Sequence, residues 1–206
     1  MEIAVIGANG KAGKLIVEEA IERGIDVTAI TCSANKSVAK NSIQKDLFLL
    51  TKEYLKNFDV VVTAFGAWTP ETLPQHTTSL QHLADLLSGT DKRLIAVGGS
   101  GSLYVDKEEL YQTPDFPEEY LPVVIATSEG LAELRKINDV KWTYISPAAN
   151  FVADAPKTGE YIFAGEEFTV NEKGESTISY ADYASALVDE IQKGNHIQER
   201  ISVLEK

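Results

Sequence analysis

The sequence predicts an α/β fold in which helices cover both faces of a doubly wound parallel sheet. Short, continuously apolar segments alternate with amphipathic segments over the first two thirds of the chain, a pattern typical of parallel strands that are buried on both faces. The first apolar segment runs directly into a glycine-rich turn and then a helix. With 206 residues, 44% of them hydrophobic, the chain is long enough for one domain with a full core.

Each element is expected from its local pattern. The expected strands are residues 3–6, 26–31, 42–46, 59–64, 93–97 and 142–146, and the one at 59–64 is β-branched and typical of a central strand. The expected helices are residues 15–23, 51–57, 73–87 and 118–136. Gly24 ends the first helix, and its Glu18, Glu19 and Glu22 are expected to face water.

After Pro147 the alternation changes. Short strands are expected at residues 160–163, 168–170 and 176–178, and an edge strand at 201–204. Ser179 and Asp182 have the spacing of a capping box and predict a helix that continues to Lys193. We expect one domain over residues 1–206, with residues 148–206 forming a short cap over the carboxyl edge of the sheet.

Composition excludes several classes of partner. The net charge of −12 disfavours nucleic acid and anionic membranes, which require clustered cations. Cys32 is the only cysteine, so no internal disulfide can form, and Met1 leads directly into the first strand. These features predict a reducing, cytoplasmic setting. The three histidines are scattered, and no group of residues has metal-ligand spacing, so no metal is expected.

The glycine turn is the main candidate site. Gly7 allows a tight turn, Gly10 allows close approach of a pyrophosphate, and Gly13 allows close packing of the helix. The helix N-terminus offers unpaired N–H groups, and the neighbouring residues that complete the cradle are Asn9, Lys11 and Ala12. A strand–helix junction that binds nothing is the competing interpretation.

The loop after the second strand bears on the choice of cofactor. No acidic residue lies between Thr31 and Asn35 to receive a free ribose diol, whereas Ser33 and Lys36 could hold a 2′-phosphate. NADP is therefore preferred over NAD, although Lys36 could equally be a solvated loop residue. Cys32 is expected to be a packed side chain rather than a reactive thiol.

The ends of the third and fourth strands supply further candidates. Asp46 and Leu47 could receive the adenine amino group, or Asp46 could simply cap a helix. Phe65 and Gly66 are expected beside the adenosine ribose. Trp68 follows, and either forms a wall of a substrate cleft or packs within its loop.

Ser100 and Ser102 are the candidate catalytic residues. They lie in a Gly/Ser loop after the fifth strand, with Gly99 as a cofactor contact, and could bind a substrate carbonyl or the nicotinamide amide. A flexible loop without a ligand is the alternative. Further candidates are Ser146 and Pro147 for the cofactor, Phe151 for a nicotinamide or substrate ring, and His76 as a proton donor or a plain surface histidine.

Several segments together resemble atypical short-chain dehydrogenases/reductases, a Rossmann-like family, in particular its NmrA-like and biliverdin-reductase-B-like NAD(P)-binding members. The matching segments are residues 3–13, 59–62, 65–66, 97–103, 146–148 and 178–184. The resemblance implies NAD(P)H in the cleft and reduction of a planar, conjugated acceptor such as a flavin or quinone. Bacterial members of this type are named as NADH-flavin reductases.

Two departures from the family pattern shape the functional prediction. Tyr120 is followed four residues later by Val124, so the Tyr-x-x-x-Lys pair is absent, and relatives often carry Arg where this chain has Cys32. Reduction of an isolated carbonyl needs a proton donor beside the developing alkoxide. A flavin or quinone delocalises the charge and can be protonated by water. The alternatives are a non-catalytic NAD(P)-binding redox sensor of NmrA-like type and, less favoured, a sugar-nucleotide epimerase.

Overall fold

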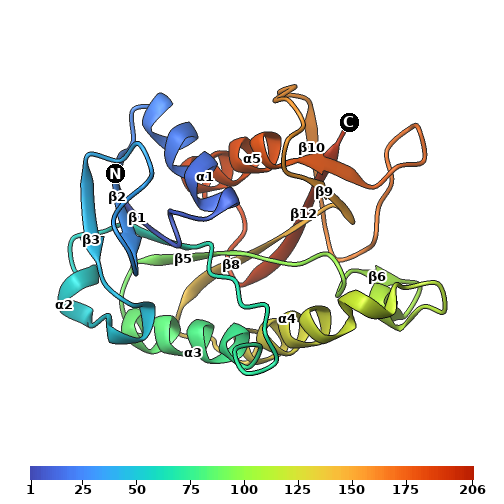
Figure 1. The fold of residues 1–206 in the computed structure, drawn as a ribbon, viewed down its shortest axis with the longest axis horizontal. Coiled ribbons are helices and arrows are strands. Elements are labelled where there is room, and N and C mark those ends of the chain that lie inside the picture. Colours follow the sequence, from blue (N-terminus) through green and yellow to red (C-terminus); the bar gives the residue numbers. More distant parts are fainter.

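The structure, a computed structural model, describes residues 1–206 and is built on one large sheet. Eight strands lie in the order β10-β12-β8-β5-β4-β1-β2-β3 (Figure 1). All neighbouring strands are parallel except β10 and β12, which are antiparallel. The prediction of a doubly wound, mostly parallel sheet is confirmed.

The strands of this sheet are β1 (Glu2–Ile6), β2 (Asp26–Thr31), β3 (Asn41–Gln44), β4 (Val60–Thr63), β5 (Arg93–Val97), β8 (Lys141–Pro147), β10 (Tyr161–Ala164) and β12 (Glu199–Glu205). Two small ribbons lie outside it and consist of β6 (Tyr104–Val105) with β7 (Glu108–Glu109), and β9 (Asn150–Val152) with β11 (Thr177–Ser179). The α-helices are α1 (Lys11–Glu22), α2 (Lys52–Leu55), α3 (Gln75–Leu87), α4 (Leu121–Leu134) and α5 (Tyr180–Lys193). Short 3-10 helices occupy Leu47–Leu49, Leu110–Gln112 and Glu118–Tyr120.

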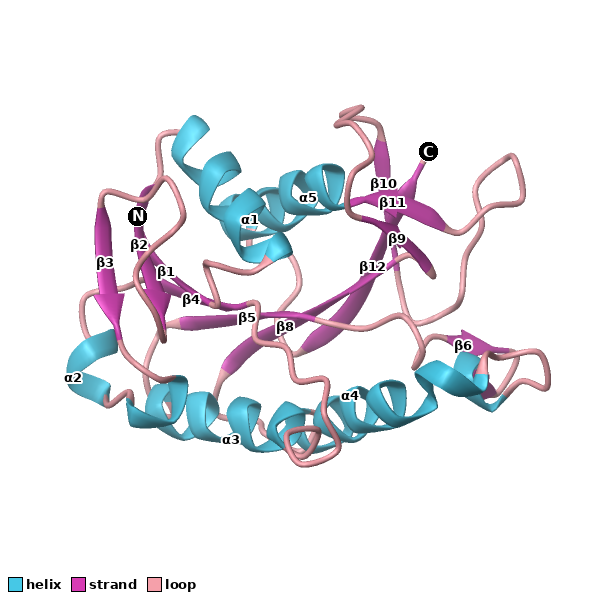
Figure 2. Cartoon of the chain, in the orientation of Figure 1, coloured by secondary structure: helices cyan, strands magenta, loops and turns pink.

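The helices form a layer on each face of the sheet. Helices α1 and α5 lie side by side on one face, and α3 and α4 cover the other (Figures 1 and 2). The chain builds β1, β2 and β3 outward, then crosses back to place β4 on the other side of β1. Strand order therefore reverses between β1 and β4, which is where open α/β sheets bind ligands at their carboxyl edge.

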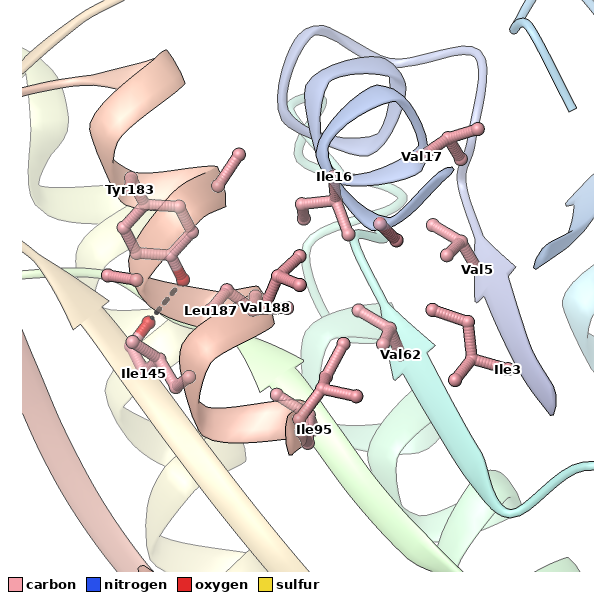
Figure 3. Close-up of a cluster of buried hydrophobic side chains, with 14 of the residues drawn as sticks. Ile3, Val5, Ile16, Val17, Val62, Ile95, Ile145, Tyr183, Leu187 and Val188 are labelled. Carbon is pink, nitrogen blue, oxygen red and sulfur yellow. Dashed lines mark hydrogen bonds between the residues drawn. The ribbon is translucent and has the colours of Figure 1, made fainter. Parts of the chain in front are cut away.

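The core has one hydrophobic cluster on each face of the sheet. Figure 3 shows the cluster under α1 and α5, in which Ile16 of α1 and Leu187 of α5 meet strand residues such as Val62. The Tyr183 hydroxyl donates a 2.6 Å hydrogen bond to the carbonyl oxygen of Ile145 and so joins α5 to β8. Each large buried side chain contributes about 1.5–3 kcal/mol of transfer free energy, so these faces fix the helices on the sheet.

The C-terminal part of the chain differs from the prediction at several points. Residues 168–170 form no strand, because the only pairing here is an isolated parallel bridge between Tyr104 and Glu167, and no ladder continues from it. Strand β12 is not an edge strand, since β10 returns antiparallel and covers its free side. The ribbons β6–β7 and β9–β11 include short strands that the sequence pattern did not predict.

Residues 148–206 contribute to three parts of the molecule. Strands β10 and β12 extend the main sheet, and α5 packs on α1. Strand β9 follows the carboxyl end of β8 and pairs with β11. Ser179 caps α5 by accepting a hydrogen bond from the backbone N–H of Asp182, as the spacing predicted. No helix is both long and apolar enough to cross a lipid bilayer.

Glu19 was expected to face water but is only 7% exposed. Its carboxylate lies 2.8 Å from Arg23 and 2.5 Å from Lys157, in the seam between α1 and the C-terminal region. The prediction was wrong because α5 packs against the side of α1 that local periodicity assigns to solvent.

Candidate functional site

The glycine turn between β1 and α1 is closely packed. Gly7 has a φ of +77°, and a β-carbon there would lie 2.7 Å from the carbonyl oxygen of Ala64, at the end of β4. A β-carbon on Gly13 would lie 2.2 Å from the carbonyl oxygen of Gly7. The two predicted roles, a tight turn at Gly7 and close helix packing at Gly13, are confirmed by this geometry.

The N-terminus of α1 is open and uncapped. Gly10 is the N-cap residue, no side chain caps the helix, and the first turn holds no acidic residue. The first helical hydrogen bond runs from the Lys14 N–H to the Gly10 carbonyl, which leaves the N–H groups of residues 11–13 without helical partners. Gly10 and Lys11 are exposed, so an anion can approach these donors.

Asn9 joins the glycine turn to the loop after β2. Its Nδ2 donates to Ser33 Oγ (3.1 Å) and to the Ala34 carbonyl (2.9 Å), and its Oδ1 accepts from the backbone N–H of Lys36 (2.7 Å). The structure therefore brings Asn9, Ser33 and Lys36 together beside the helix N-terminus. Cys32 is exposed and not packed as expected, because it begins the exposed loop 32–34 that follows β2.

The ends of β3 and β4 carry the next group of candidates. Asp46 accepts a 2.8 Å hydrogen bond from the Phe48 N–H and caps a 3-10 helix, which is the competing role that the sequence left open. Leu47 is buried. Phe65 makes an edge-on contact with Phe48, with ring centroids 6.3 Å apart.

The loop after β4 is held by His76. The Nε2 atom of His76 lies 2.9 Å from the carbonyl oxygen of Ala67, and its ring contacts Phe65. Trp68 is 77% exposed, and its indole Nε1 would lie 3.3 Å from a β-carbon at Gly66. The side chain of Trp68 therefore lies beside Gly66, and both residues remain open to solvent.

The Gly/Ser loop after β5 separates the two candidate serines. Ser100 is half-buried and its hydroxyl has no hydrogen-bonding partner in the protein, whereas Ser102 is buried and held by Arg200. Packing also explains why two positions of this loop require glycine. A β-carbon on Gly98 would lie 2.2 Å from the Tyr144 ring, and one on Gly101 would lie 2.1 Å from Val124. Ser100 is the serine that remains available to a ligand.

Tyr144 of β8 packs against the Gly/Ser loop after β5. Its hydroxyl oxygen accepts a 3.2 Å hydrogen bond from the backbone N–H of Gly99, the predicted cofactor contact. Burial raises the pKa of the Tyr144 hydroxyl, so it stays neutral at physiological pH.

The end of β8 and the β9–β11 ribbon hold the remaining candidates. Ser146 is fully buried, its Oγ lies 3.4 Å from Arg200, and Pro147 is buried beside it. Phe151 is stacked on Tyr180, with ring centroids 3.7 Å apart. Ser102 and Ser146 thus meet at Arg200, and both serines are buried.

A model of the NAD(P)H-binding family matches residues 7–193. The chain belongs to the NAD(P)H-binding family. SP1627 of Streptococcus pneumoniae, for which NADH-flavin reductase activity is proposed, is 57% identical, with a TM-score of 0.98 over 100% of both chains. YwnB of Bacillus subtilis, an uncharacterized protein, is 43% identical over 210 residues, which cover 99% of this chain and 98% of YwnB. A proposed epimerase of Bacteroides thetaiotaomicron is 31% identical, with a TM-score of 0.88 over 99% and 96% of the two chains.

The geometry fits the cofactor of the NAD(P)H-binding family. A pyrophosphate needs bare backbone and free N–H donors, and the open Gly10 with the uncapped α1 supplies both. The family resemblance inferred from the sequence is confirmed, and the domain binds a nicotinamide cofactor.

Arg200 is the structural residue that the sequence analysis missed. Its guanidinium is buried, donates to the Ser102 carbonyl (3.1 Å), and pairs with Glu166. One signal in the sequence could have indicated this contact. Polar and apolar residues alternate along β12, which places Arg200 and Ser202 on one face of the strand and Ile201 and Val203 on the other.

Proposed function

We propose that this protein is an NAD(P)H-dependent oxidoreductase that passes hydride to a planar, conjugated acceptor such as a flavin or quinone, with NADPH as the preferred donor. When bound, the cofactor supplies a hydride from its nicotinamide ring. The acceptor gains that hydride and takes one proton from solvent, so that two electrons and two hydrogens are transferred in all. The 57% identity to SP1627 supports this class of reaction.

The observation that carries the proposal is the missing Tyr-x-x-x-Lys pair, the proton-donating pair of typical family members. The other candidates are held by the protein: His76 Nε2 lies 2.9 Å from the Ala67 carbonyl oxygen, and Ser102 is buried against Arg200. The position four residues after Tyr120 is Val124 and not Lys. An isolated carbonyl loses the rate gain of a positioned proton donor without such a pair, whereas an acceptor that delocalises its incoming charge depends on it less.

The chain's own residues have positional roles in this proposal. The α1 N-terminus and Gly10 bind the pyrophosphate, and the loop Gly98–Ser102 shapes the floor of the acceptor site. Ser100 offers a hydroxyl to the acceptor or to the nicotinamide amide. Orientation of two stacked rings is then the main catalytic contribution of the protein.

The test is anaerobic stopped-flow oxidation of NADPH and NADH with FMN, riboflavin and a quinone, and with a simple aldehyde as the matched non-planar acceptor. Multiple turnovers with the planar acceptors and none with the aldehyde are expected. Tight NADPH binding without turnover on any acceptor would overturn the proposal and favour the redox-sensor alternative. Preferred reduction of the aldehyde would also overturn it.

A further inference from the structure

We infer that Asn9 is a positioning residue that makes the site selective for NADPH, by orienting Ser33 and Lys36 toward the 2′-phosphate. This inference rests on the proposed preference for NADPH. It assigns Asn9 a role toward the loop after β2 and not toward the pyrophosphate.

The amide of Asn9 is fully used by this loop. Its Nδ2 donates at 3.1 Å to Ser33 Oγ and at 2.9 Å to the Ala34 carbonyl, and its Oδ1 accepts at 2.7 Å from the Lys36 N–H. An amide has two donor hydrogens and one acceptor oxygen, and all three have partners here. Asn9 has no donor left for a pyrophosphate.

The bond to Ser33 determines what its hydroxyl can do. Because Ser33 Oγ accepts a hydrogen from Asn9, the serine's own O–H must point elsewhere, and no acceptor in the protein receives it. Ser33 is exposed. Its hydroxyl is therefore a free donor at the end of β2, where the adenosine ribose of a bound dinucleotide lies.

Lys36 supplies the charge. It is exposed, and its ammonium takes part in none of the ion pairs of this strongly acidic protein. Because Asn9 holds the backbone N–H of Lys36, Asn9 determines the position from which the Lys36 side chain extends. A hydroxyl donor and a free cation on one short loop are suited to a phosphate monoester.

The loop depends on Asn9 because little else ties it to the rest of the protein. Residues 32–34 are exposed, and Thr31 Oγ1 donates to the Ser33 carbonyl at 2.7 Å. Asn35 organises the following turn by bonds to Ser37 and Ala39 only. Asn9 is thus the link between this turn and the rigid glycine turn.

The experiment measures dissociation constants of NADPH and NADH by calorimetry for the wild type, Asn9→Ala, Ser33→Ala and the double variant. We expect Asn9→Ala to weaken NADPH binding about tenfold and NADH binding less than about twofold, since charge-assisted hydrogen bonds to the phosphate are lost. Ser33→Ala is expected to have a smaller effect of the same kind. The double variant should lose less NADPH binding free energy than the two single variants lose together, because Asn9 acts in part through Ser33.

Asn171→Ala is the matched control. Asn171 also holds a loop through its Oδ1, which accepts at 3.0 Å from the N–H groups of Lys173 and Glu175, and this loop belongs to the C-terminal part of the chain. The Asn171→Ala variant should have the same cofactor selectivity as the wild type. If Asn9→Ala does not fold, Asn9→Ser takes its place in the same measurement, because its single hydroxyl cannot make all three bonds of the Asn9 amide.

The inference would be overturned if Asn9→Ala lost the same affinity for NADPH and for NADH, or lost affinity for neither. A wild type that binds both cofactors equally would do so as well. Failure of the proposed reaction looks different, since it leaves the NADPH preference intact and abolishes only turnover with the planar acceptors.

Discussion

The carbonyl oxygen of Gly7 lies where a side chain on Gly13 would begin, because a β-carbon at position 13 would be only 2.2 Å away. A second neighbour, the α-carbon of Ala8, would be 2.9 Å away. Both are backbone atoms that cannot rotate aside. The first turn of α1 therefore rests directly on the turn that we propose binds the pyrophosphate, so the fold and the proposed site depend on the same contact.

Replacement of Gly13 by alanine should lower the free energy of unfolding by about 1–3 kcal/mol, because the added methyl group forces α1 away from the turn. NADPH affinity should fall at the same time. Urea unfolding and calorimetry measure the two effects. Gly165→Ala is the control, since its β-carbon would meet no atom within 4 Å. Equal stability of the two variants would contradict the packing seen here.

Replacement of Gly10 by glutamate should separate binding from stability. A carboxylate beside the pyrophosphate costs about 4 kcal/mol of repulsion at an effective dielectric of 20, so cofactor affinity should fall more than a hundredfold. The same charge at the N-terminus of α1 favours the helix, whereas the new β-carbon would lie 3.2 Å from the Gly7 carbonyl oxygen, so stability to urea should change little. Unchanged NADPH affinity would show that the cofactor lies elsewhere.

Ser100 and Ser102 should respond differently to alanine substitution. Ser100→Ala removes a hydroxyl with no protein partner, so it should lower kcat with FMN about threefold to tenfold and leave stability unchanged. Ser102→Ala loses a buried contact with Arg200 and should cost about 1 kcal/mol of stability, with a smaller effect on kcat. Steady-state kinetics and urea unfolding test this, and the reverse pattern would refute the assignment of Ser100 to the ligand.

Trp68 should report cofactor binding by its fluorescence. The protein has two tryptophans, of which Trp68 is 77% exposed beside Gly66 and Trp142 is 2% exposed in the core. NADPH should quench the wild-type emission, and Trp68→Phe should lose most of this change while calorimetry still detects binding. A full fluorescence change in Trp68→Phe would place the cofactor away from the end of β4.

Asp182 should make stability depend on pH. Burial by itself raises the pKa of its carboxyl, but hydrogen bonds from the backbone N–H groups of Thr158 and Gly159 and from the hydroxyls of Thr158 and Ser179 outweigh it, and the pKa is lowered. A lowered pKa in the folded state stabilises the protein above the ordinary value of 3.8, and this contribution is lost as the pH falls through the folded value.

Asp182→Asn should therefore be less stable than the wild type at pH 7, and the difference should shrink as the pH falls below about 4. Urea unfolding from pH 3 to 8 measures it. Asp154→Asn, at an exposed position, should match the wild type at every pH. A difference between Asp182→Asn and the wild type that stays constant with pH would contradict the role of the charge.

The N-terminal half of the site could be predicted from local pattern. The apolar strand, the glycines at fixed spacing and the helix lie within the first 24 residues, so their geometry follows from short-range sterics. The loop after β5 was located correctly, but the two serines in it have different surroundings. That difference arises from Arg200, which lies 98 residues further along the chain from Ser102, and no local pattern reports such a contact.

The sequence by itself determined the alternation of strands and helices, the parallel sheet and the glycine turn, because periodic burial and glycine placement are local properties of the chain. Only the tertiary structure decided that β10 closes the edge beside β12, that Glu19 is covered by the C-terminal region, and that Asn9 joins two loops. Each of these depends on which segments, distant in sequence, meet in space, and that is settled by the packing of the whole domain.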